Sequence, residues 1–361
     1  MFMPGGWRHD HWNLHAYRHL FHSQVLRQAL GSLPDFPMKS TSHLIFLVAW
    51  SLVSATTAFA APRTLQPNQV SQLRTLAWDG TDDRLVLQVD TVIEAPNWTP
   101  DGQWLIYNSN GLLYKVPADG STPPVQIPVG LTNVNNDHVL SPDGSTVYLS
   151  ANGHLFAAPI TGGKPRKISN DHAPERNFRY FLHGVSPDGK LLAYVGAENV
   201  GTDIWGRLDL YTIPAAGGRD VQLTNTPAPD DGPEYSPDGK WIYFNSELCA
   251  KVAGHAQIFR MRPDGSGTEQ LTHDERINWF PHVSPDGQWV VYLSFPPGTV
   301  KHPADKEVLL RRIRPDGRDR TELAAFLGGQ GTFNVHSWAP DSRRFAYISY
   351  PILGPGERKT Q

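Results

Sequence analysis

The chain has 361 residues, of which 39% are hydrophobic and 19% are charged, and its formal net charge at pH 7 is -3. This charge gives no excess of basic residues of the kind that nucleic-acid-binding proteins use, and the chain is long enough to bury a sizeable core. The single cysteine, Cys249, excludes an intramolecular disulfide, so stability must come from packing.

The N-terminal region has two candidate start sites, Met1 and Met38. Residues 1–37 are rich in His and Arg and would be an upstream segment without a structural role if the chain starts at Met38. From there a lysine, a short apolar stretch and the small-residue site Ala58-Phe59-Ala60 are typical of a secretory signal. The alternative is a transmembrane anchor, but so short an apolar stretch followed by a small-residue site favours cleavage. We therefore expect residues 38–60 to be a cleaved signal peptide and the mature protein to be periplasmic.

A five-residue motif recurs six times after residue 90. It consists of a hydrophobic residue, then Ser, Thr or Ala, then Pro-Asp, and finally Gly or Ser. Its Asp residues follow one another at intervals of 42, 45, 50, 48 and 55 residues. Repeats of about 40 to 50 residues are typical of propeller blades or solenoid units. The six residues are Asp101, Asp143, Asp188, Asp238, Asp286 and Asp341.

Each motif opens a unit with the pattern of four β-strands. A run that alternates apolar and polar residues follows the motif, as in residues 103–109, and such runs rich in Tyr, Val, Ile and Trp predict strands. A second strand and a short third one come next, and Asp-Gly or Gly-Gly pairs between them suit tight hairpins. A loop then returns to the strand that carries the next motif.

The last unit lacks its outer half, because only residues 351–361 follow its motif and strand. Residues 71–80 and 84–89 match the missing strands. If the two ends share one blade, the ring closes and leaves no open sheet edge. We therefore predict an all-β fold, a closed six-bladed β-propeller of four-stranded blades over residues 63–352, followed by a C-terminal tail over 353–361.

The repeated phrase resembles that of a known family. The pattern Pro-x-Trp/Tyr/Val-Ser-Pro-Asp-Gly, followed by Gly-Gly or Asp-Gly and Gln-Leu-Thr, resembles the repeat of TolB-type propellers, also called PD40 or WD40-like repeats. This resemblance implies protein binding at a propeller face, with an envelope protein as partner. TolB of the Tol-Pal system carries an α/β domain before its propeller, whereas about ten residues separate Ala61 from the first strand here. That departure puts a Tol-Pal role in doubt.

The two faces of such a ring differ in their loops. If the strand that ends in Pro-Asp is innermost, the Pro-Asp turns and the Asp-Gly turns share one short, uniform face. The opposite face collects the long irregular segments, such as residues 295–306 and 325–333. Sites on rigid β scaffolds usually lie where loops vary and a channel opens. We therefore expect the functional site on the long-loop face.

A polar residue lies two or three places before the Ser, Thr or Ala of each motif, and we expect these residues to line the channel at that opening. Imidazoles and a carboxylate from separate strands could bind a ligand, hold a divalent metal or provide a general base. The alternative is that they only line a water-filled channel. The six residues are Asn97, His138, His183, Glu234, His282 and His336, of which the four histidines are the candidate metal ligands.

Further polar residues are expected on the same rim. Arg179, Tyr180 and Asn278 are assigned to ligand binding with the six residues above. The remaining candidates on this rim are Asp137, Asp231, Lys301, His302 and Asn334.

The repeats also resemble those of oligogalacturonate lyases, whose propellers hold a divalent ion with His and polar side chains. In that chemistry the metal neutralises a uronate carboxylate while a base removes a proton. The resemblance implies Mn, Ca, Zn or Ni as cofactor and a carbohydrate as ligand. Those lyases have seven blades and this chain has six, so we assign no individual roles. A metal-dependent lyase and a monomeric binding protein for an envelope partner stay as alternatives.

Overall fold

The computed structural model describes residues 63–198 and 207–357. The predicted upstream segment over 1–37 and the predicted signal peptide over 38–60 lie outside the described residues, as does the end of the predicted tail. In the ranges just given, no helix has the length and apolar character needed to cross a membrane.

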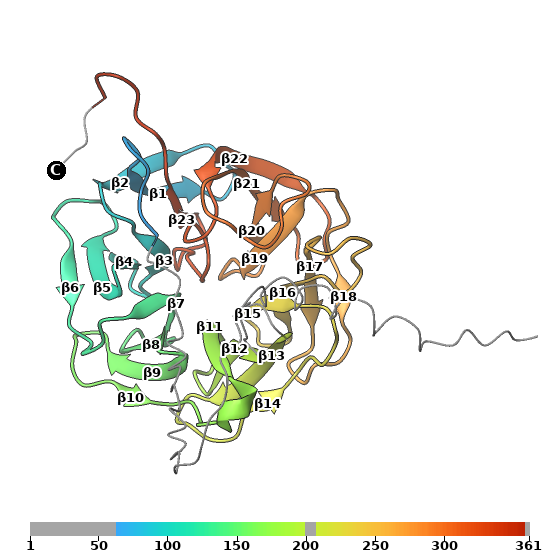
Figure 1. The fold of residues 1–361 in the computed structure, drawn as a ribbon. Helices are drawn as coiled ribbons and strands as arrows, with labels where there is room; N and C mark the ends of the chain where they lie inside the picture. The colour runs from blue at the N-terminus through green and yellow to red at the C-terminus, as the bar shows by residue number, and fades with distance from the viewer. Residues whose placement is uncertain (1–62, 199–206, 358–361) are drawn as a thin grey trace, which may run out of the picture. The chain divides into compact units, whose positions relative to one another are not determined.

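Six antiparallel sheets surround a central channel, as Figure 1 shows, and the predicted β-propeller is confirmed. Blades 1 to 5 have four strands each, and the strand that ends at a Pro-Asp turn is innermost. Blade 1 consists of β3 (Glu94–Trp98), β4 (Trp104–Ser109), β5 (Leu112–Pro117) and β6 (Val125–Ile127); blade 2 of β7 (Val134–Leu140), β8 (Thr146–Ala151), β9 (His154–Pro159) and β10 (Arg166–Lys167); blade 3 of β11 (Arg179–Val185), β12 (Leu191–Glu198), β13 (Arg207–Pro214) and β14 (Val221–Gln222); blade 4 of β15 (Asp230–Tyr235), β16 (Ile242–Ser246), β17 (Gln257–Met261) and β18 (Glu269–Gln270); blade 5 of β19 (Ile277–Val283), β20 (Val290–Phe295), β21 (Lys306–Ile313) and β22 (Thr321–Gly328).

Blade 6 joins the two ends of the repeat region, as predicted. Its sheet order is β2 (Asp83–Val89), β1 (Ser71–Ala77) and β23 (Arg344–Ser349), and Leu73 of β1 pairs with Ile348 of β23. Figure 1 shows the blue N-terminal strands beside the red β23. The inner edge is irregular, because residues 332–338 meet β23 only through scattered backbone bonds and one bridge, Trp338 to Phe345. Closure of the ring removes the sheet edges that an open array would expose.

The Pro-Asp motif forms the turn between the first and second strand of each blade. In blade 2, Asp143 Oδ1 accepts hydrogen bonds from Ser141 Oγ and from the Ser145 backbone N–H, which lies 3.0 Å away. Ser141 Oγ in turn accepts a bond from Thr146 N at 3.0 Å, and Gly144 has a φ of 69° that favours glycine. Local chemistry therefore specifies these turns.

A β-bulge interrupts each innermost strand of blades 1 to 5. In β15 the register shifts between Asp231 and Glu234, with Gly232 at a φ of 64° and Pro233 next to it. An extra residue changes which side chains share a face of the strand. Asp231 and Glu234 consequently both face the channel, at two different depths.

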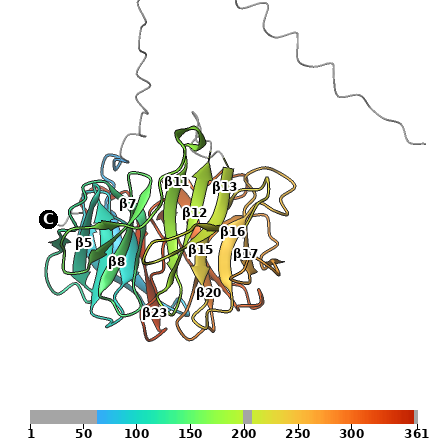
Figure 2. The same cartoon turned by 90° about the horizontal axis from the view of Figure 1, so that it is seen from below.

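The hydrophobic core lies mainly between neighbouring blades. Leu73 of blade 6, Leu105 of blade 1 and Ile348 of blade 6 are fully buried in one cluster. A second cluster joins Phe345 and Trp338 to the strands of blade 5. Figure 2 shows the blades from the side, with strands that run between the two faces of the ring. Packed blades thus hold the channel-lining strands in place and leave the loops of both faces to vary.

Candidate functional site

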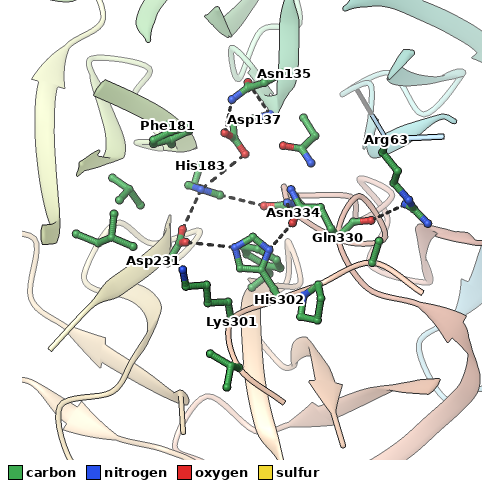
Figure 3. A pocket seen from close by; sticks show the side chains of 17 residues that line it. Arg63, Asn135, Asp137, Phe181, His183, Asp231, Lys301, His302, Gln330 and Asn334 are labelled. Atoms are coloured by element: carbon green, nitrogen blue, oxygen red, sulfur yellow. Dashed lines mark hydrogen bonds and ion pairs between the residues drawn. The ribbon is translucent and has the colours of Figure 1, made fainter. Parts of the chain in front are cut away.

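A cavity of about 500 Å³ opens on the long-loop face of the channel (Figure 3). We call it the long-loop cavity. Its apolar walls include Phe181, Val195, Leu208, Phe280 and Val300. Its polar groups come from the beginnings of inner strands and from two loops, and they are Arg63, Asn135, Asn136, Asp137, His183, Asp231, Lys301, His302, Gln330 and Asn334.

His183 stands at the electrostatic centre of this cavity. Its Nε2 lies 3.2 Å from Asp231 Oδ1 and 3.9 Å from Asp137 Oδ1, and its Nδ1 lies 3.0 Å from the carbonyl oxygen of Asn334. Both ring nitrogens therefore face acceptors, so both carry a proton and the ring is an imidazolium. Burial by itself lowers the pKa of His183, but the hydrogen bond to Asp231 and the two carboxylate charges raise it to about 9.

The two carboxylates around His183 differ in the direction in which their pKa is shifted. Burial raises the pKa of Asp137 to about 6, and the Asp231 charge adds to that rise while His183 opposes it. Burial also acts to raise the pKa of Asp231, but the hydrogen bond and charge of His183 outweigh it and hold this pKa below its usual value. Asn135 supports Asp137 with a bond from Nδ2 to Oδ2 of 2.7 Å. Asp137 is thus the carboxylate whose charge is compensated less well by the protein, and a donor group of a ligand would stabilise it.

The loop side chain His302 closes one side of the cavity. Its Nε2 lies 3.9 Å from Asp231 Oδ2, and its Nδ1 contacts Gln330 Oε1. The ring packs edge-on against Trp279 and Phe280, with centroid distances of 4.5 and 5.1 Å. Burial lowers the pKa of His302, which keeps the imidazole neutral. This side chain therefore anchors the long loop to the channel wall.

Arg63 fixes the rim of the cavity from the N-terminal end of the described chain. Its guanidinium donates to the Gln330 carbonyl at 3.0 Å and to Asp305 Oδ1 at 2.9 Å, and it lies 3.7 Å above the Tyr350 ring. These contacts tie together two loops and the closing blade. The shape of the opening of the long-loop cavity therefore does not depend on one loop alone.

A second polar layer lies deeper in the channel and is centred on Glu234. This buried carboxylate accepts hydrogen bonds from His282 Nδ1, from His336 Nδ1 at 2.9 Å and from Val283 N at 2.9 Å. Burial acts to raise the pKa of Glu234, but the two histidines outweigh it and lower the pKa to about 2. The layer continues through Asn97, whose Nδ2 donates to the His336 carbonyl at 2.8 Å.

The six channel residues do not gather at the long-loop opening, so that part of the prediction is wrong. Only His183 lines the long-loop cavity. With Asn97, Glu234 and His336 it also lines a second cavity of about 360 Å³ on the face of the Pro-Asp turns, which we call the Pro-Asp cavity. The physical reason is that Asn97 and Glu234 lie past the bulges of their innermost strands. His183 lies within the bulge of β11, and His336 belongs to the irregular inner edge of blade 6. His138 and His282 are buried in the wall between the two cavities and line neither.

The rim residues predicted from the long-loop face behave differently. Asp137, Asp231, Asn334, Lys301 and His302 all line the long-loop cavity, as expected from their position. They precede the bulges or belong to the long loops, and both groups point toward this opening (Figure 3).

Arg179, Tyr180 and Asn278 lie outside both cavities. Tyr180 points into blade 3, where its hydroxyl donates to Asp220 Oδ2 at 3.0 Å. Asn278 is fully buried and accepts from Ser294 Oγ at 2.7 Å. Their assignment to ligand binding gains no support from these positions.

The four candidate metal ligands do not fit one metal ion. Both ring nitrogens of His183 and both ring nitrogens of His282 lie beside protein acceptors, and the Nδ1 of His336 contacts Glu234. Burial lowers the pKa of His138 to about 3, and its Nδ1 contacts Asn97 Oδ1. Within residues 63–198 and 207–357, no three His, Cys, Asp or Glu side chains form a group that could hold a metal. Metal binding by this set stays a prediction, and we derive no metal-dependent step.

Several lining residues were missed at the level of sequence. Phe181 and Phe280 form apolar walls, and Arg63 and Gln330 brace the rim. Prolines at the bulges, such as Pro281, are a sequence signal that could have predicted where an inner strand changes the direction of its side chains. The residue before it, Phe280, has a φ of 55°. Arg63 and Gln330 carry no comparable signal, since their contacts join distant parts of the chain.

The chain is similar to proteins of one family. The model named PD40, TolB beta propeller domain, matches residues 184–303. Atu1656, an uncharacterised protein of Agrobacterium fabrum, is 39% identical over 273 residues, which cover 74% of this chain and 88% of that protein. The solved structure of a candidate TolB from Agrobacterium tumefaciens is 36% identical, with a TM-score of 0.71, and the match covers 79% of this chain and 99% of that one.

Two more distant structures share the fold alone. TolB from Acinetobacter baumannii is 20% identical with a TM-score of 0.56, and the match covers 73% of this chain and 65% of that one. An oligogalacturonate lyase in complex with manganese is 14% identical with a TM-score of 0.50, with coverage of 73% and 75%. Neither likeness transfers a site to this chain.

Proposed function

This chain belongs to the TolB-like β-propeller family, and on that premise we propose that it is an exported periplasmic protein that binds an envelope protein through the long-loop cavity. The observation that carries the proposal is the cavity itself, with apolar walls around the buried His183 and its two carboxylates. A site of this kind can take one projecting group of a partner, rather than a flat surface.

The chemistry of the cavity specifies the group that would enter. Figure 3 shows Lys301 directed toward Asp231, while Asp137 lies on the other side of His183. The carboxylate of Asp137 is therefore placed to accept a hydrogen bond from a ligand. Its pKa, which burial raises to about 6, falls when a cation or an N–H donor binds beside it. An aliphatic stem would pack against Phe181 and Leu208 on the way in. A lysine or arginine side chain of the partner meets both requirements.

The metal-dependent lyase has less support than protein binding. Its chemistry requires several histidine nitrogens directed at one point, whereas those of His183 and His282 are held by protein acceptors. The likeness to the oligogalacturonate lyase, at 14% identity, extends to the fold alone. Binding of a partner needs no such convergence.

The test is photo-crosslinking in living cells. A photoreactive amino acid replaces Val300, which is 62% exposed and lines the long-loop cavity, in the protein expressed with its own signal. The matched control carries it at Val221, which is 51% exposed on the outer strand β14. We expect a discrete envelope-protein adduct from position 300 and none from position 221.

The Asp137→Asn variant sharpens this test. Loss of its charge should weaken the adduct from position 300, because an amide cannot form an ion pair with a cationic side chain. Equal adducts from both positions, or an adduct from position 300 that Asp137→Asn leaves unchanged, would count against a binding site in this cavity.

A further inference from the structure

The six Pro-Asp turns form an interlocked ring around the Pro-Asp cavity. At four junctions the proline of one turn contacts the glycine of the next, and a methyl group placed on that glycine would lie close to the ring of the proline. These distances are 3.4 Å for Gly102 to Pro340, 3.2 Å for Gly144 to Pro100, 3.4 Å for Gly189 to Pro142 and 3.8 Å for Gly239 to Pro187. Blade-to-blade contact thus closes most of this rim.

The ring is open at one junction, between blades 4 and 5. A methyl group on Gly287 would meet nothing within 4 Å, so Pro237 does not cover this turn. The next junction is closed again, because Ser342 Oγ accepts a hydrogen bond from Asp286 N at 2.9 Å. Four of the five turns that carry a glycine meet the proline of the preceding turn, so the gap is a specific feature of the fourth and fifth turns.

A groove of about 470 Å³ runs through this gap. It shares Ser236, Pro237, Val283 and Pro285 with the Pro-Asp cavity, so the two spaces form one continuous cleft. We call it the turn cleft. It leads from the polar floor around Glu234 and His336, past the gap, to an aromatic shelf at the edge of blade 4.

The shelf is rigid and aromatic. Trp241 lies under the guanidinium groups of Arg260 and Arg262, at 4.1 and 3.9 Å from the ring centroid. Arg260 also donates to Glu269 Oε2 at 2.7 Å and to the Pro315 carbonyl at 2.9 Å. The stacked Trp241, Arg260 and Arg262 side chains form an ordered surface at the edge of the groove, so a ligand that packs against it causes little loss of side-chain entropy.

The walls favour one backbone conformation of a bound chain. Pro237, Pro285 and Pro315 line the groove and have no backbone N–H, so they cannot pair with an added β-strand. A polyproline II segment needs no such ladder and packs its rings between aromatic and proline side chains. A proline-containing extended segment therefore fits these walls better than a strand does.

The charges flanking the groove select a basic side chain. Asp286 lines it, and the turn fixes this carboxylate, whose Oδ1 accepts from Ser284 Oγ at 2.6 Å and Gln288 N at 3.0 Å. Asp238 also lines the groove, but its Oδ2 lies 3.0 Å from Lys240 Nζ, so its charge is already paired. The one arginine in the lining, Arg260, is already paired with Glu269. A carboxylate has room for further donors beyond those of its own turn.

We propose that the turn cleft binds a proline-containing extended segment of a partner protein, with an apolar side chain in the Pro-Asp cavity and a basic side chain at Asp286. This site lies on the opposite face from the long-loop cavity and does not depend on the function proposed for it. The two sites would allow the ring to hold two segments at once.

The experiment uses an array of ten-residue peptides in which proline and leucine surround one arginine. Matched sets replace the arginine by glutamate, or every proline by alanine. Fluorescence anisotropy measures binding to the mature protein. We expect arginine and proline members to bind at least about tenfold more tightly than either matched set.

Four variants locate the binding. Trp241→Ala removes the shelf, and Gly287→Asn narrows the gap with a residue that tolerates a positive φ; both should lose at least about tenfold in affinity. Trp104→Ala is the matched control, since Trp104 holds the same repeat position in blade 1 and lies under Lys115 at 4.5 Å. Val300→Trp, in the long-loop cavity, should leave the affinity unchanged. Thermal melts confirm that each variant is folded.

Three results would overturn the proposal. One is the finding that no peptide with both arginine and proline binds the wild-type protein more tightly than it binds the Trp241→Ala variant. Another is an equal loss in Trp104→Ala and Trp241→Ala, which would indicate a general effect on the fold. A loss caused by Val300→Trp alone would instead assign the peptides to the long-loop cavity.

Discussion

His183 and Asp231 form a buried ion pair between blades 3 and 4, with Nε2 and Oδ1 3.2 Å apart. The pair lies at the bottom of the long-loop cavity, and His183 also lines the Pro-Asp cavity. It therefore separates the two mouths of the channel. Because both partners are nearly inaccessible to solvent, neither charge can be removed without leaving the other unpaired.

The first prediction concerns the stability that depends on this pair. Replacing His183 by Ala leaves two buried carboxylates without their cation, and we expect the free energy of unfolding to fall by about 3–5 kcal/mol. Urea denaturation measures it. The matched control is His154→Ala, at a half-buried histidine of blade 2 outside both cavities. A loss below about 1 kcal/mol for His183→Ala would contradict a charged pair.

The second prediction concerns alkaline pH. The pKa of His183 is raised to about 9 in the folded protein from an ordinary value of 6.5. The stability it contributes is therefore fully present below pH 6.5 and is lost as the pH rises through about 9. We expect the melting temperature to fall over that window, and to fall less in His183→Gln. Parallel curves for the two proteins would show that His183 does not hold an extra proton.

The third prediction concerns acid pH. The pKa of His138 is lowered to about 3 by burial, so its contribution to stability is present above pH 6.5 and is lost as the pH falls toward 3. The lowered pKa of Glu234 adds a loss between about pH 4.5 and 2. We expect His138→Asn to be less stable than wild type at pH 7 and to lose less on acidification to pH 4. Differential scanning calorimetry at both pH values measures this. An equal loss in both proteins would be the contrary result.

The fourth prediction concerns ring closure. Leu73 of β1 is completely buried where the N-terminal strand meets β23, and Leu73→Ala should cost about 2–5 kcal/mol of unfolding free energy. Leu85 of β2 is 49% exposed, and Leu85→Ala should change stability by less than about 0.5 kcal/mol. Urea denaturation of both variants compares them. Similar values for the two would mean that the closing blade is not held by this contact.

The fifth prediction concerns metal. Since His183 and His282 engage both ring nitrogens with protein groups, elemental analysis of the purified protein should find less than stoichiometric Mn, Ca, Zn or Ni. The double variant His138→Ala/His282→Ala serves as the reference. About one ion per chain in wild type, absent from the variant, would favour the metal-dependent enzyme over the binding protein.

The fold was predictable because its signals are local and repeated. The Asp of each Pro-Asp turn accepts bonds from its own neighbours, as Asp143 does from Ser141 and Ser145, so the turn can be read from five residues. The shared blade was predictable for a related reason. The alternating pattern of residues 71–77 matches a strand that the last unit lacks, and β1 does pair with β23.

The candidate site was predictable only in part. The sequence by itself determined the number of blades, the face of the long loops and the rim residues Asp137, Asp231 and His302. Only the tertiary structure decided that Asn97, Glu234 and His336 belong to the opposite mouth. For Asn97 and Glu234 the reason is that a bulge changes the facing of a strand without changing its composition. The same holds for ion pairs between blades, such as His183 with Asp231, whose partners are brought together by the packing of blades around the channel.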